Sequence, residues 1–265
     1  MFEKNRMDKI KISVVKYANS YPFIFGLKNS GFDKKVILSM DHPADCAAKL
    51  VSNIVDIGLI PVAALPMLAE HHIISDCCIG ANERVKTVML LSNTPFDKIE
   101  TIYLDYRSLT SVNLVQILAK NYWKREFKWV KTDENFDFTK INNKEAVTLI
   151  GDQCFEYENH FKYDIDLAFE WKNFTGLPFV FACWTANKKI NPEFIDEFNR
   201  TLKWGVKNIA AVVAEMGQTG VIRGKDLEHY LTKNIDFKLN ADKHKALKLF
   251  LSFIEKLEKT HLTIF

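Results

Sequence analysis

The sequence predicts an α/β protein built from two lobes, and three observations indicate this fold class. First, apolar segments alternate with amphipathic segments over residues 11–62, in the order β-α-β-α-β. That order builds a parallel sheet with helices on its faces. Second, short apolar segments continue between residues 86 and 185, whereas the pattern beyond Pro192 is helical only. Third, the 265 residues suffice for two lobes of ordinary size.

The first five elements are predicted from local patterns. Residues 11–17 form a strand that leads into Asn19 and Ser20, and Pro22 then stands in the first turn of a helix. Ser and Asn favour the helix N-cap, and Pro favours the first helical position. The next three elements are a strand at residues 35–40, a helix at 43–51 and a strand at 55–62. The last strand is expected to be buried, because its apolar run is nearly continuous.

The later elements divide the chain between the lobes. We predict strands at residues 86–91, 101–105, 147–151 and 179–185, and helices at residues 110–123, 192–216, 225–234 and 242–259. A chain that crosses twice between two lobes would give lobe 1 from residues 1–94 and 186–265 and lobe 2 from residues 95–185. A ligand is expected in the cleft between them, facing the carboxyl ends of the strands.

Composition excludes several classes of partner. The net charge is only +3, and lysines such as Lys243 and Lys248 share a helical pattern with Leu247 and Phe250, which is typical of a solvated helix face. We therefore expect no nucleic-acid partner. No apolar run is long enough to span a bilayer, so we expect no membrane partner either. The sequence makes no prediction of oligomeric state.

Cysteine usage and the N-terminal segment favour a soluble, cytoplasmic protein. The five cysteines contain no CxxC pair, and no histidine stands at metal-ligand spacing from them. An odd count without a disulfide framework fits reduced thiols in the cytosol. Residues 1–9 are polar and charged with no apolar stretch behind them, so no secretory signal is expected. We predict neither a metal nor an organic cofactor.

Asn19 is the first candidate for a functional residue. It stands where the carboxyl end of a strand meets a helix start, a place where free backbone N–H groups and the helix dipole can hold an anion. Its amide would then contact a ligand. The alternative is that Asn19 only caps the helix, since Asn is among the commonest N-cap residues.

Six segments together resemble a known family. They are KISVVKYANSYPF (11–23), DIGLIPVAALP (56–66), GANERVKTVMLL (80–91), YLDYRSLTSVN (103–113), IGDQC (150–154) and TGLPFVFACW (175–184). In this order, over residues 9–188, they resemble the menaquinone-biosynthesis family that contains the chorismate dehydratases (MqnA) and the 1,4-dihydroxy-6-naphthoate synthases (MqnD). The likeness weakens in the helical C-terminal part.

The resemblance implies a periplasmic-binding-protein-like fold of type II, with two α/β lobes around a central cleft and a helical C-terminal segment packing on lobe 1. It also implies a cofactor-independent carbon–oxygen lyase of the futalosine pathway. That enzyme removes water from chorismate and gives 3-[(1-carboxyvinyl)oxy]benzoate. The sister synthases have a Cys-Pro-Asn-Asp type segment where this chain has Tyr17-Ala18-Asn19-Ser20, which favours the dehydratase branch.

Four positions depart from the family pattern. The family more usually has a bulkier residue at Ala18, a basic residue at Tyr21, Ser at Thr87 and Arg at Gln153. These departures leave the predicted fold unchanged but weaken the transfer of substrate contacts to Thr87 and Tyr21.

The resemblance also implies roles for particular residues. Asn19 is the expected catalytic residue. The expected substrate-binding residues are Ser20, Thr87, Ser108, Thr110 and Ser111. Hydroxyl groups and backbone N–H groups at helix starts can hold the two carboxylates of chorismate in a fixed pose. For the Ser/Thr cluster at residues 108–111, simple N-capping is the alternative.

The proton acceptor is left as a hypothesis. The enolpyruvyl carboxylate of chorismate hangs from C3 and can reach the C3 proton, so we expect substrate-assisted proton removal. Asp152 would then orient neighbouring backbone; as a base it would meet like-charge repulsion from a dianionic substrate. Asp105 is a further candidate base. Arg84 could contact a carboxylate or pair with Glu83 on the surface.

Three alternative functions remain open. A solute-binding protein of the same fold would normally be exported or lipid-anchored, and the N-terminus shows neither feature. The effector-binding part of a transcription regulator would need a helix-turn-helix unit, for which residues 1–9 are too short. The sister synthase is disfavoured by the segment Tyr17-Ala18-Asn19-Ser20. The scattered histidines are not expected to be catalytic, and Trp123, Trp171 and Trp184 are expected in the core.

Overall fold

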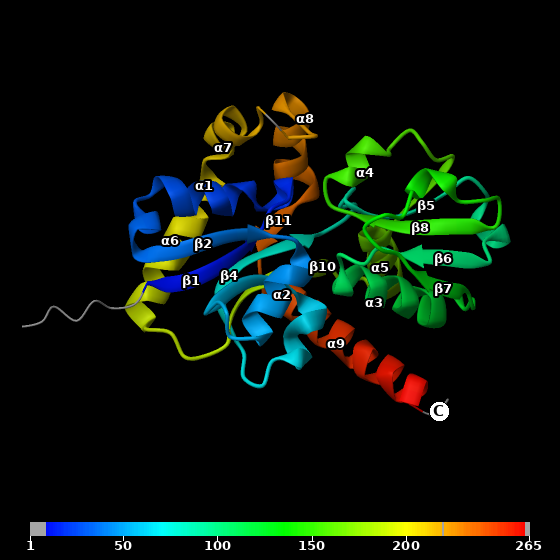
Figure 1. The fold of residues 1–265 in the computed structure, drawn as a ribbon, viewed down its shortest axis with the longest axis horizontal. Helices are drawn as coiled ribbons and strands as arrows, with labels where there is room; N and C mark the ends of the chain where they lie inside the picture. The colour runs from blue at the N-terminus through cyan, green and yellow to red at the C-terminus, as the bar shows by residue number, and fades with distance from the viewer. Residues whose placement is uncertain (1–8, 219, 263–265) are drawn as a thin grey trace, which may run out of the picture.

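The strands lie in two sheets, one in each of two lobes (Figure 1). The computed structural model describes residues 9–218 and 220–262. Within these residues the larger sheet has six strands in the order β11-β4-β10-β3-β1-β2, and the smaller has five in the order β7-β6-β8-β5-β9. The larger sheet contains β1 (Ile10–Val15), β2 (Val36–Asp41), β3 (Ile57–Pro61), β4 (His72–Ala81), β10 (Phe179–Ala186) and β11 (Asp236–Lys238). The smaller contains β5 (Val88–Ser92), β6 (Thr101–Leu104), β7 (Lys128–Lys131), β8 (Glu145–Ile150) and β9 (Tyr163–Asp166).

The predicted parallel start of the first lobe is confirmed. β1 pairs in parallel with β2 on one side and with β3 on the other. The connections run through α1 (Tyr21–Asn29) and α2 (Pro43–Val51). β4 was absent from the prediction, because His72, Ser75 and Asp76 interrupt its apolar pattern. It pairs antiparallel with both β10 and β11.

Sheet membership differs from the predicted lobe division at two strands. β5 falls inside the range predicted for lobe 1, yet it pairs with β8 and β9 of the smaller sheet. β10 was predicted in lobe 2, yet it lies between β3 and β4 of the larger sheet. A buried apolar strand has the same local pattern in either sheet, so its partners could not be inferred locally. We propose that the crossings lie at residues 82–87 and 176–178, with residues 88–175 forming the second lobe.

Helices cover both sheets. Those of the second lobe are α3 (Leu109–Leu118), α4 (Gln153–Glu156) and α5 (Leu167–Thr175), and the C-terminal part contains α6 (Pro192–Lys207), α7 (Ile209–Met216), α8 (Gly224–His229) and α9 (Ala241–Leu262). Short 3₁₀ helices are η1 (Ala18–Ser20), η2 (Phe32–Lys35), η3 (Val62–Met67), η4 (Phe96–Lys98) and η6 (Phe138–Lys140), and π-helical turns are η5 (Ala119–Trp123) and η7 (Tyr230–Asn234). The helix predicted at residues 192–216 is therefore two helices, broken at Asn208, whose backbone leaves the helical region.

The C-terminal helices connect the lobes more extensively than predicted. α6 and α7 pack on α1 of the first lobe, as expected. α9 contacts β10 and η3 of the first lobe and also α3 of the second (Figure 1). Phe250 of α9 packs edge-on against Phe179 of β10 and Trp171 of α5.

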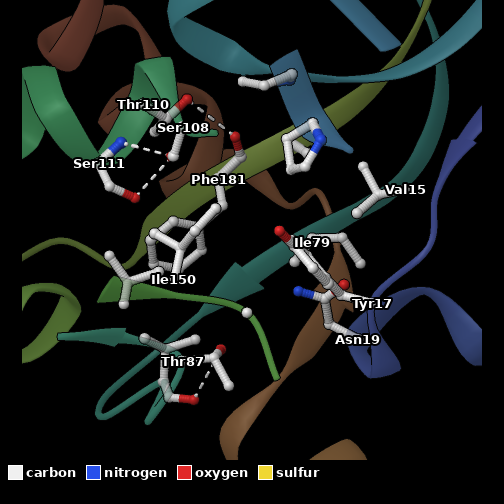
Figure 2. Close-up of a pocket in the computed structure, with 16 residues that line it drawn as sticks. Val15, Tyr17, Asn19, Ile79, Thr87, Ser108, Thr110, Ser111, Ile150 and Phe181 are labelled. Carbon is white, nitrogen blue, oxygen red and sulfur yellow. Dashed lines mark hydrogen bonds between the residues drawn. The ribbon is translucent and has the colours of Figure 1, made fainter. Parts of the chain in front are cut away.

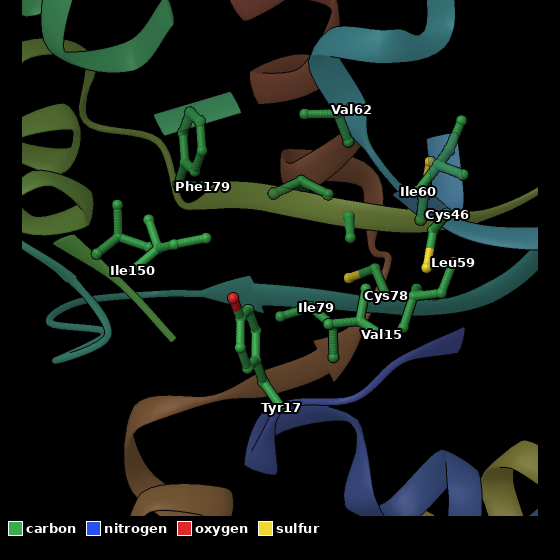
Figure 3. Close-up of a cluster of buried hydrophobic side chains, with 14 of the residues drawn as sticks. Val15, Tyr17, Cys46, Leu59, Ile60, Val62, Cys78, Ile79, Ile150 and Phe179 are labelled. Carbon is green, nitrogen blue, oxygen red and sulfur yellow. The ribbon is translucent and has the colours of Figure 1, made fainter. Parts of the chain in front are cut away.

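The core of the first lobe extends to the cleft. Trp184 is fully buried between Phe23 and Phe198, with ring centroids 5.7 and 5.0 Å away. Each such aromatic pair contributes about 0.5–1.5 kcal/mol beyond its buried area. Figure 3 shows where this core meets the second lobe, with Tyr17 and Ile79 on the side that faces Ile150. Packing in the first lobe therefore holds in place the residues that form its side of the cleft.

Candidate functional site

A pocket with a cavity volume of about 50 Å³ lies between the lobes. Its wall is mainly apolar, with hydroxyl and amide groups at a few points (Figure 2). The lining residues come from both lobes, from β1 and the turn after it, the start of α2, β3, β4, the first crossing, the start of α3, the end of β8 and β10: Val15, Tyr17, Asn19, Pro43, Pro61, Ile79, Val85, Thr87, Val88, Ser108, Thr110, Ser111, Ile150, Gly151, Phe181 and Ala182.

Asn19 lines the pocket from η1, immediately before α1. Its Oδ1 accepts a hydrogen bond from Ser20 Oγ at 3.1 Å. Neither η1 nor α1 begins with a side-chain capping hydrogen bond, so the capping interpretation of Asn19 is wrong. Ser20, predicted to bind substrate, is fully buried behind Asn19 and does not line the pocket. The Ser20 hydroxyl instead holds the oxygen of the Asn19 amide.

Thr87 lines the pocket at the first crossing between the lobes. Its hydroxyl lies 2.8 Å from the hydroxyl of Tyr230 and 3.4 Å from the carbonyl oxygen of Val85. Tyr230 belongs to the C-terminal η7 and is 1% exposed. Burial raises the pKa of Tyr230 well above its usual value, while the hydrogen bond with Thr87 opposes this effect. No local pattern marked Tyr230, because its partners are far away in the sequence.

The hydroxyl cluster at the start of α3 caps the helix and also lines the pocket. Ser108 is the N-cap: its Oγ accepts the Ser111 N–H at 3.1 Å and donates to Ser111 Oγ at 2.9 Å. Thr110 Oγ1 accepts the N–H of Ala63 and donates to the carbonyl oxygen of Phe181, both at 3.3 Å. Ala63 and Phe181 belong to the first lobe. The cluster therefore caps α3, ties the lobes together and lines the pocket (Figure 2).

Asp152 also joins the two lobes. It follows β8 of the second lobe, and its two carboxylate oxygens lie 3.0 and 3.1 Å from the N–H of Ala18 in the first lobe. Burial raises the pKa of Asp152 to about 6, although the Ala18 N–H lowers it and Glu156 raises it slightly further. The carboxylate thus holds the backbone residue immediately before Asn19, as the hypothesis of an orienting role expects.

A buried ion pair fixes the loop that precedes α3. Arg107 donates to Asp105 through Nε at 2.8 Å and Nη2 at 2.6 Å, and Nη2 also donates to Gln153 at 2.7 Å. Asp105 is fully buried and already paired. Bidentate geometry of this kind is strong and directional. Local sequence patterns did not indicate a role for Arg107. Its partner Asp105 lies only two residues away, in a segment with neither helical nor strand spacing.

Tyr17 and His42 form a second pair that sequence patterns missed. The Tyr17 hydroxyl lies 3.1 Å from Nδ1 of His42. Burial raises the pKa of Tyr17, with Arg107 acting in the opposite sense. Burial also lowers the pKa of His42, helped by Lys16 and Arg107. Both groups are therefore held neutral near pH 7.

Arg84 lies outside the pocket lining. Its side chain is exposed and its guanidinium stacks over the ring of Phe169, with 4.7 Å from Cζ to the ring centroid. All five cysteines are unpaired and buried. Across residues 9–218 and 220–262, no group of three or more His, Cys, Asp or Glu side chains is arranged to bind a metal ion. Over the same residues, no helix combines the length and the apolar character needed to cross a bilayer.

Sequence comparison decides the family. A family model described as menaquinone biosynthesis matches residues 10–256, nearly the whole chain. The chain belongs to the menaquinone biosynthesis family. A relative in this comparison is the chorismate dehydratase of Campylobacter jejuni subsp. jejuni serotype O:23/36 (strain 81-176). It is 24% identical over 251 residues, which cover 92% of this chain and 96% of the relative.

Comparison with solved structures shows the fold of this member of the menaquinone biosynthesis family. The protein AF1704 from Archaeoglobus fulgidus superposes with a TM-score of 0.73 at 12% identity, covering 96% of this chain and 99% of that one. The alkanesulfonate-binding protein SsuA from Xanthomonas axonopodis pv. citri gives a TM-score of 0.64 at 12% identity, covering 92% and 93%. A Candida albicans protein with the generic periplasmic-binding-protein fold gives 0.64 at 11% identity, covering 91% and 90%. The chain therefore has the periplasmic-binding-protein-like fold that the resemblance implied.

Proposed function

We propose that this protein is a chorismate dehydratase, which eliminates water from chorismate to give 3-[(1-carboxyvinyl)oxy]benzoate in the futalosine route to menaquinone. The observation that carries the proposal is the meeting of Asn19 with Thr87, Ser108, Thr110 and Ser111 around one interlobe pocket. Membership of the menaquinone biosynthesis family and the chorismate dehydratase relative support the choice of reaction. We place the reaction in the cytoplasm, in keeping with the sequence-based expectation.

The proposed dehydration suits a pocket lined by uncharged hydrogen-bond donors. Chorismate carries two carboxylates, and the reaction removes the C3 proton and the C4 hydroxyl. Aromatisation then supplies the driving force, so the elimination requires no organic cofactor. The protein's task is to hold the ring in a reactive pose and to stabilise negative charge as it develops. An amide N–H from Asn19 and hydroxyl groups from Thr87 and the α3 start can supply such donors.

We further propose that the enolpyruvyl carboxylate of the substrate removes the C3 proton. Two observations on protein carboxylates support this step. Asp105 is buried in a bidentate pair with Arg107. Asp152 accepts the Ala18 N–H and is not among the described residues that line the pocket. Both carboxylates therefore already have structural partners, whereas the substrate carboxylate is attached beside the proton that must leave.

Product analysis separates this proposal from its alternatives. Purified protein is incubated with chorismate, and the mixture is analysed by chromatography and mass spectrometry. A dehydratase gives an aromatic enol ether with one water fewer than chorismate. A solute-binding protein binds chorismate and returns it unchanged, and the sister naphthoate synthase leaves it unaltered. Unchanged chorismate after prolonged incubation with folded protein would exclude the dehydratase function.

A further inference from the structure

Tyr17 carries the one titratable group among the described residues that line the pocket. Figure 3 shows its hydroxyl pointing away from β1, into the space between Ile79 and Ile150, which also line the pocket. The other polar side chains of the lining are the Asn19 amide and the hydroxyl groups of Thr87 and of the α3 start. Amides and aliphatic hydroxyl groups do not ionise near neutral pH, whereas a phenol is a weak acid. Tyr17 is therefore the candidate proton donor of the pocket.

His42 contacts the Tyr17 hydroxyl from the start of α2. Nδ1 of His42 lies 3.1 Å from the phenol oxygen, and the two rings meet edge-on with centroids 5.8 Å apart. His42 stands at the N-cap position of α2, yet its side chain makes no capping hydrogen bond there, so the ring is available to Tyr17. Tyr17 is buried, whereas His42 is only half-buried. The pair therefore links the pocket to solvent.

The proposed dehydration needs a proton at the C4 oxygen of chorismate. Hydroxide is a poor leaving group, and a positioned acid that protonates it as the C4–O bond breaks lowers the barrier. The hydroxyl groups of Thr87, Ser108 and Thr110 already donate to partners within the protein. Burial raises the pKa of Tyr17 above its usual value, so the phenol keeps its proton at neutral pH. It can still deliver that proton to hydroxide, which is a much stronger base than a phenolate.

We propose that Tyr17 is a catalytic acid that protonates the departing C4 hydroxyl group of chorismate, with Nδ1–H of His42 donating to the phenol oxygen. This inference rests on the proposed function. The electron pair of the C3–H bond forms the C3–C4 double bond, and the C3 proton moves to the enolpyruvyl carboxylate. The C4–O bonding pair leaves with the oxygen, which takes the Tyr17 proton and departs as water. Tyr17 then recovers a proton from Nδ1 of His42, while Nε2 takes one from solvent and the product carboxyl group releases one.

The first test changes the leaving group. Tyr17→Phe keeps the ring that lies against Gly151 and removes only the hydroxyl. Because general acid catalysis contributes about a hundredfold or more, we expect kcat for chorismate to fall by that factor. A chorismate analogue with fluorine in place of the C4 hydroxyl loses fluoride, which needs no proton to leave. Wild-type protein and Tyr17→Phe should therefore convert this analogue at similar rates. Tyr103→Phe is the matched control: it removes a hydroxyl that bonds to Glu145, outside the pocket lining, and should leave both rates unchanged.

The second test concerns His42. His42→Phe keeps an aromatic ring and removes the Nδ1 donor. A hydrogen bond to a developing phenolate is charge-assisted, so its loss should lower kcat for chorismate about tenfold or more. In a Tyr17→Phe background the same change should have almost no further effect, because the oxygen that His42 stabilises is gone. Independent, multiplying losses in the double variant would overturn the role of His42.

The third test needs no turnover. Nitrogen NMR of the His42 ring, assigned by the signals that disappear in His42→Phe, reports which ring nitrogen carries the hydrogen. We expect the hydrogen on Nδ1, with a signal that shifts in Tyr17→Phe and stays in place in Tyr103→Phe. A near-normal kcat of Tyr17→Phe, an equal loss with chorismate and the fluorine analogue, or a hydrogen on Nε2 would each overturn the inference and leave the proposed function standing. If wild-type protein leaves chorismate unchanged, the proposed function fails and the acid role fails with it, while the NMR result still decides whether His42 donates to Tyr17.

Discussion

Asn19 combines a fixed amide oxygen with an amide nitrogen on the pocket side of the first lobe. Ser20 holds the oxygen, and the neighbouring Ala18 N–H is held by Asp152 of the other lobe. The backbone and the side chain of this residue are therefore both restrained before a ligand enters. Preorganised donors of this kind stabilise developing charge without reorganising during the reaction.

We expect Asn19→Ala to lose about a hundredfold or more in kcat while the protein stays folded. One well-placed donor to a developing charge contributes roughly 3 kcal/mol, which corresponds to that factor. Steady-state kinetics with chorismate and a thermal unfolding curve measure the two quantities. Near-normal kcat with reduced stability would show that Asn19 has a structural role only.

Asp152→Asn tests the difference between a base and an orienting group. Asn keeps an oxygen that can accept the Ala18 N–H, so we expect a folded enzyme with most of its kcat. A loss of several orders of magnitude at normal chorismate affinity would instead identify Asp152 as the base.

The same variant gives a pH-dependent stability test. Burial raises the pKa of Asp152 to about 6 in the folded protein, against ~3.9 in an unfolded chain. Between these values the folded protein binds more protons, so ionisation lowers the free energy of unfolding as pH rises from about 4 to about 6. Wild-type protein should lose roughly 1–3 kcal/mol relative to Asp152→Asn over this range, measured by urea denaturation. A difference that does not vary with pH would contradict the assignment.

Local sequence patterns were sufficient to predict some of the individual residues of the site. Asn19, Ser20, Thr87 and the cluster at residues 108–111 stand at strand ends or helix starts. All of these residues except Ser20 and Leu109 line the pocket. Arg107 and Tyr230 could not be found in this way. Their importance depends on contacts with Gln153 and Thr87, and such pairings are set by the packing of lobes rather than by neighbouring residues.

At the scale of an element, two residues at the start of α3 allow ligand binding and stability to be tested separately. Ser111 is capped by Ser108 and lines the pocket, whereas Thr110 also satisfies the buried N–H of Ala63. The amino end of a helix suits an anionic group, because its free N–H groups and its dipole favour negative charge.

We expect Ser111→Ala to raise KM for chorismate more than it lowers kcat, because it removes a contact to a carboxylate in the ground state. Thr110→Val should show the same kinetic pattern and also lose about 1–3 kcal/mol of stability, since the Ala63 N–H loses its acceptor. Kinetics and denaturant unfolding of both variants provide the measurements. An unchanged KM in both would place this helix start outside the substrate site.

Elements themselves were predictable where one pattern dominates. The apolar run at residues 55–62 and the Pro-initiated helix at residue 43 both form as expected. The break at Asn208 and the strand at residues 72–81 were not predicted. The first lies inside a continuous helical pattern, and the second is stabilised by two antiparallel partners that are distant in the sequence.

For the whole molecule, the two lobes are in direct contact. Contacts between the lobes include Asp152 with Ala18 and Thr110 with Phe181. Gly151 has a φ of +69°, and a Cβ there would lie 2.8–2.9 Å from ring atoms of Tyr17. Tyr17 itself is buried, so its ring has little room to move. A side chain at position 151 would therefore oppose closure.

Gly151→Ala should raise KM for chorismate and give a larger radius of gyration in solution scattering with chorismate present. Gly176→Ala is the matched control, because Gly176 has a φ of +73° but no atom within 4 Å of an added Cβ. Both variants carry the backbone strain of a left-handed residue, and only the first disturbs the contact between lobes. Identical behaviour of the two would show that closure does not depend on the contact between Gly151 and Tyr17.

The most direct test of the central claim is turnover of chorismate by wild-type protein after exhaustive chelation and desalting. The proposed reaction needs only the donors of the interlobe pocket and the carboxylate of the substrate. We expect 3-[(1-carboxyvinyl)oxy]benzoate to form at the same rate before and after this treatment. Recovery of unchanged chorismate, or a rate that returns only when a metal ion or nicotinamide is added, would contradict the account.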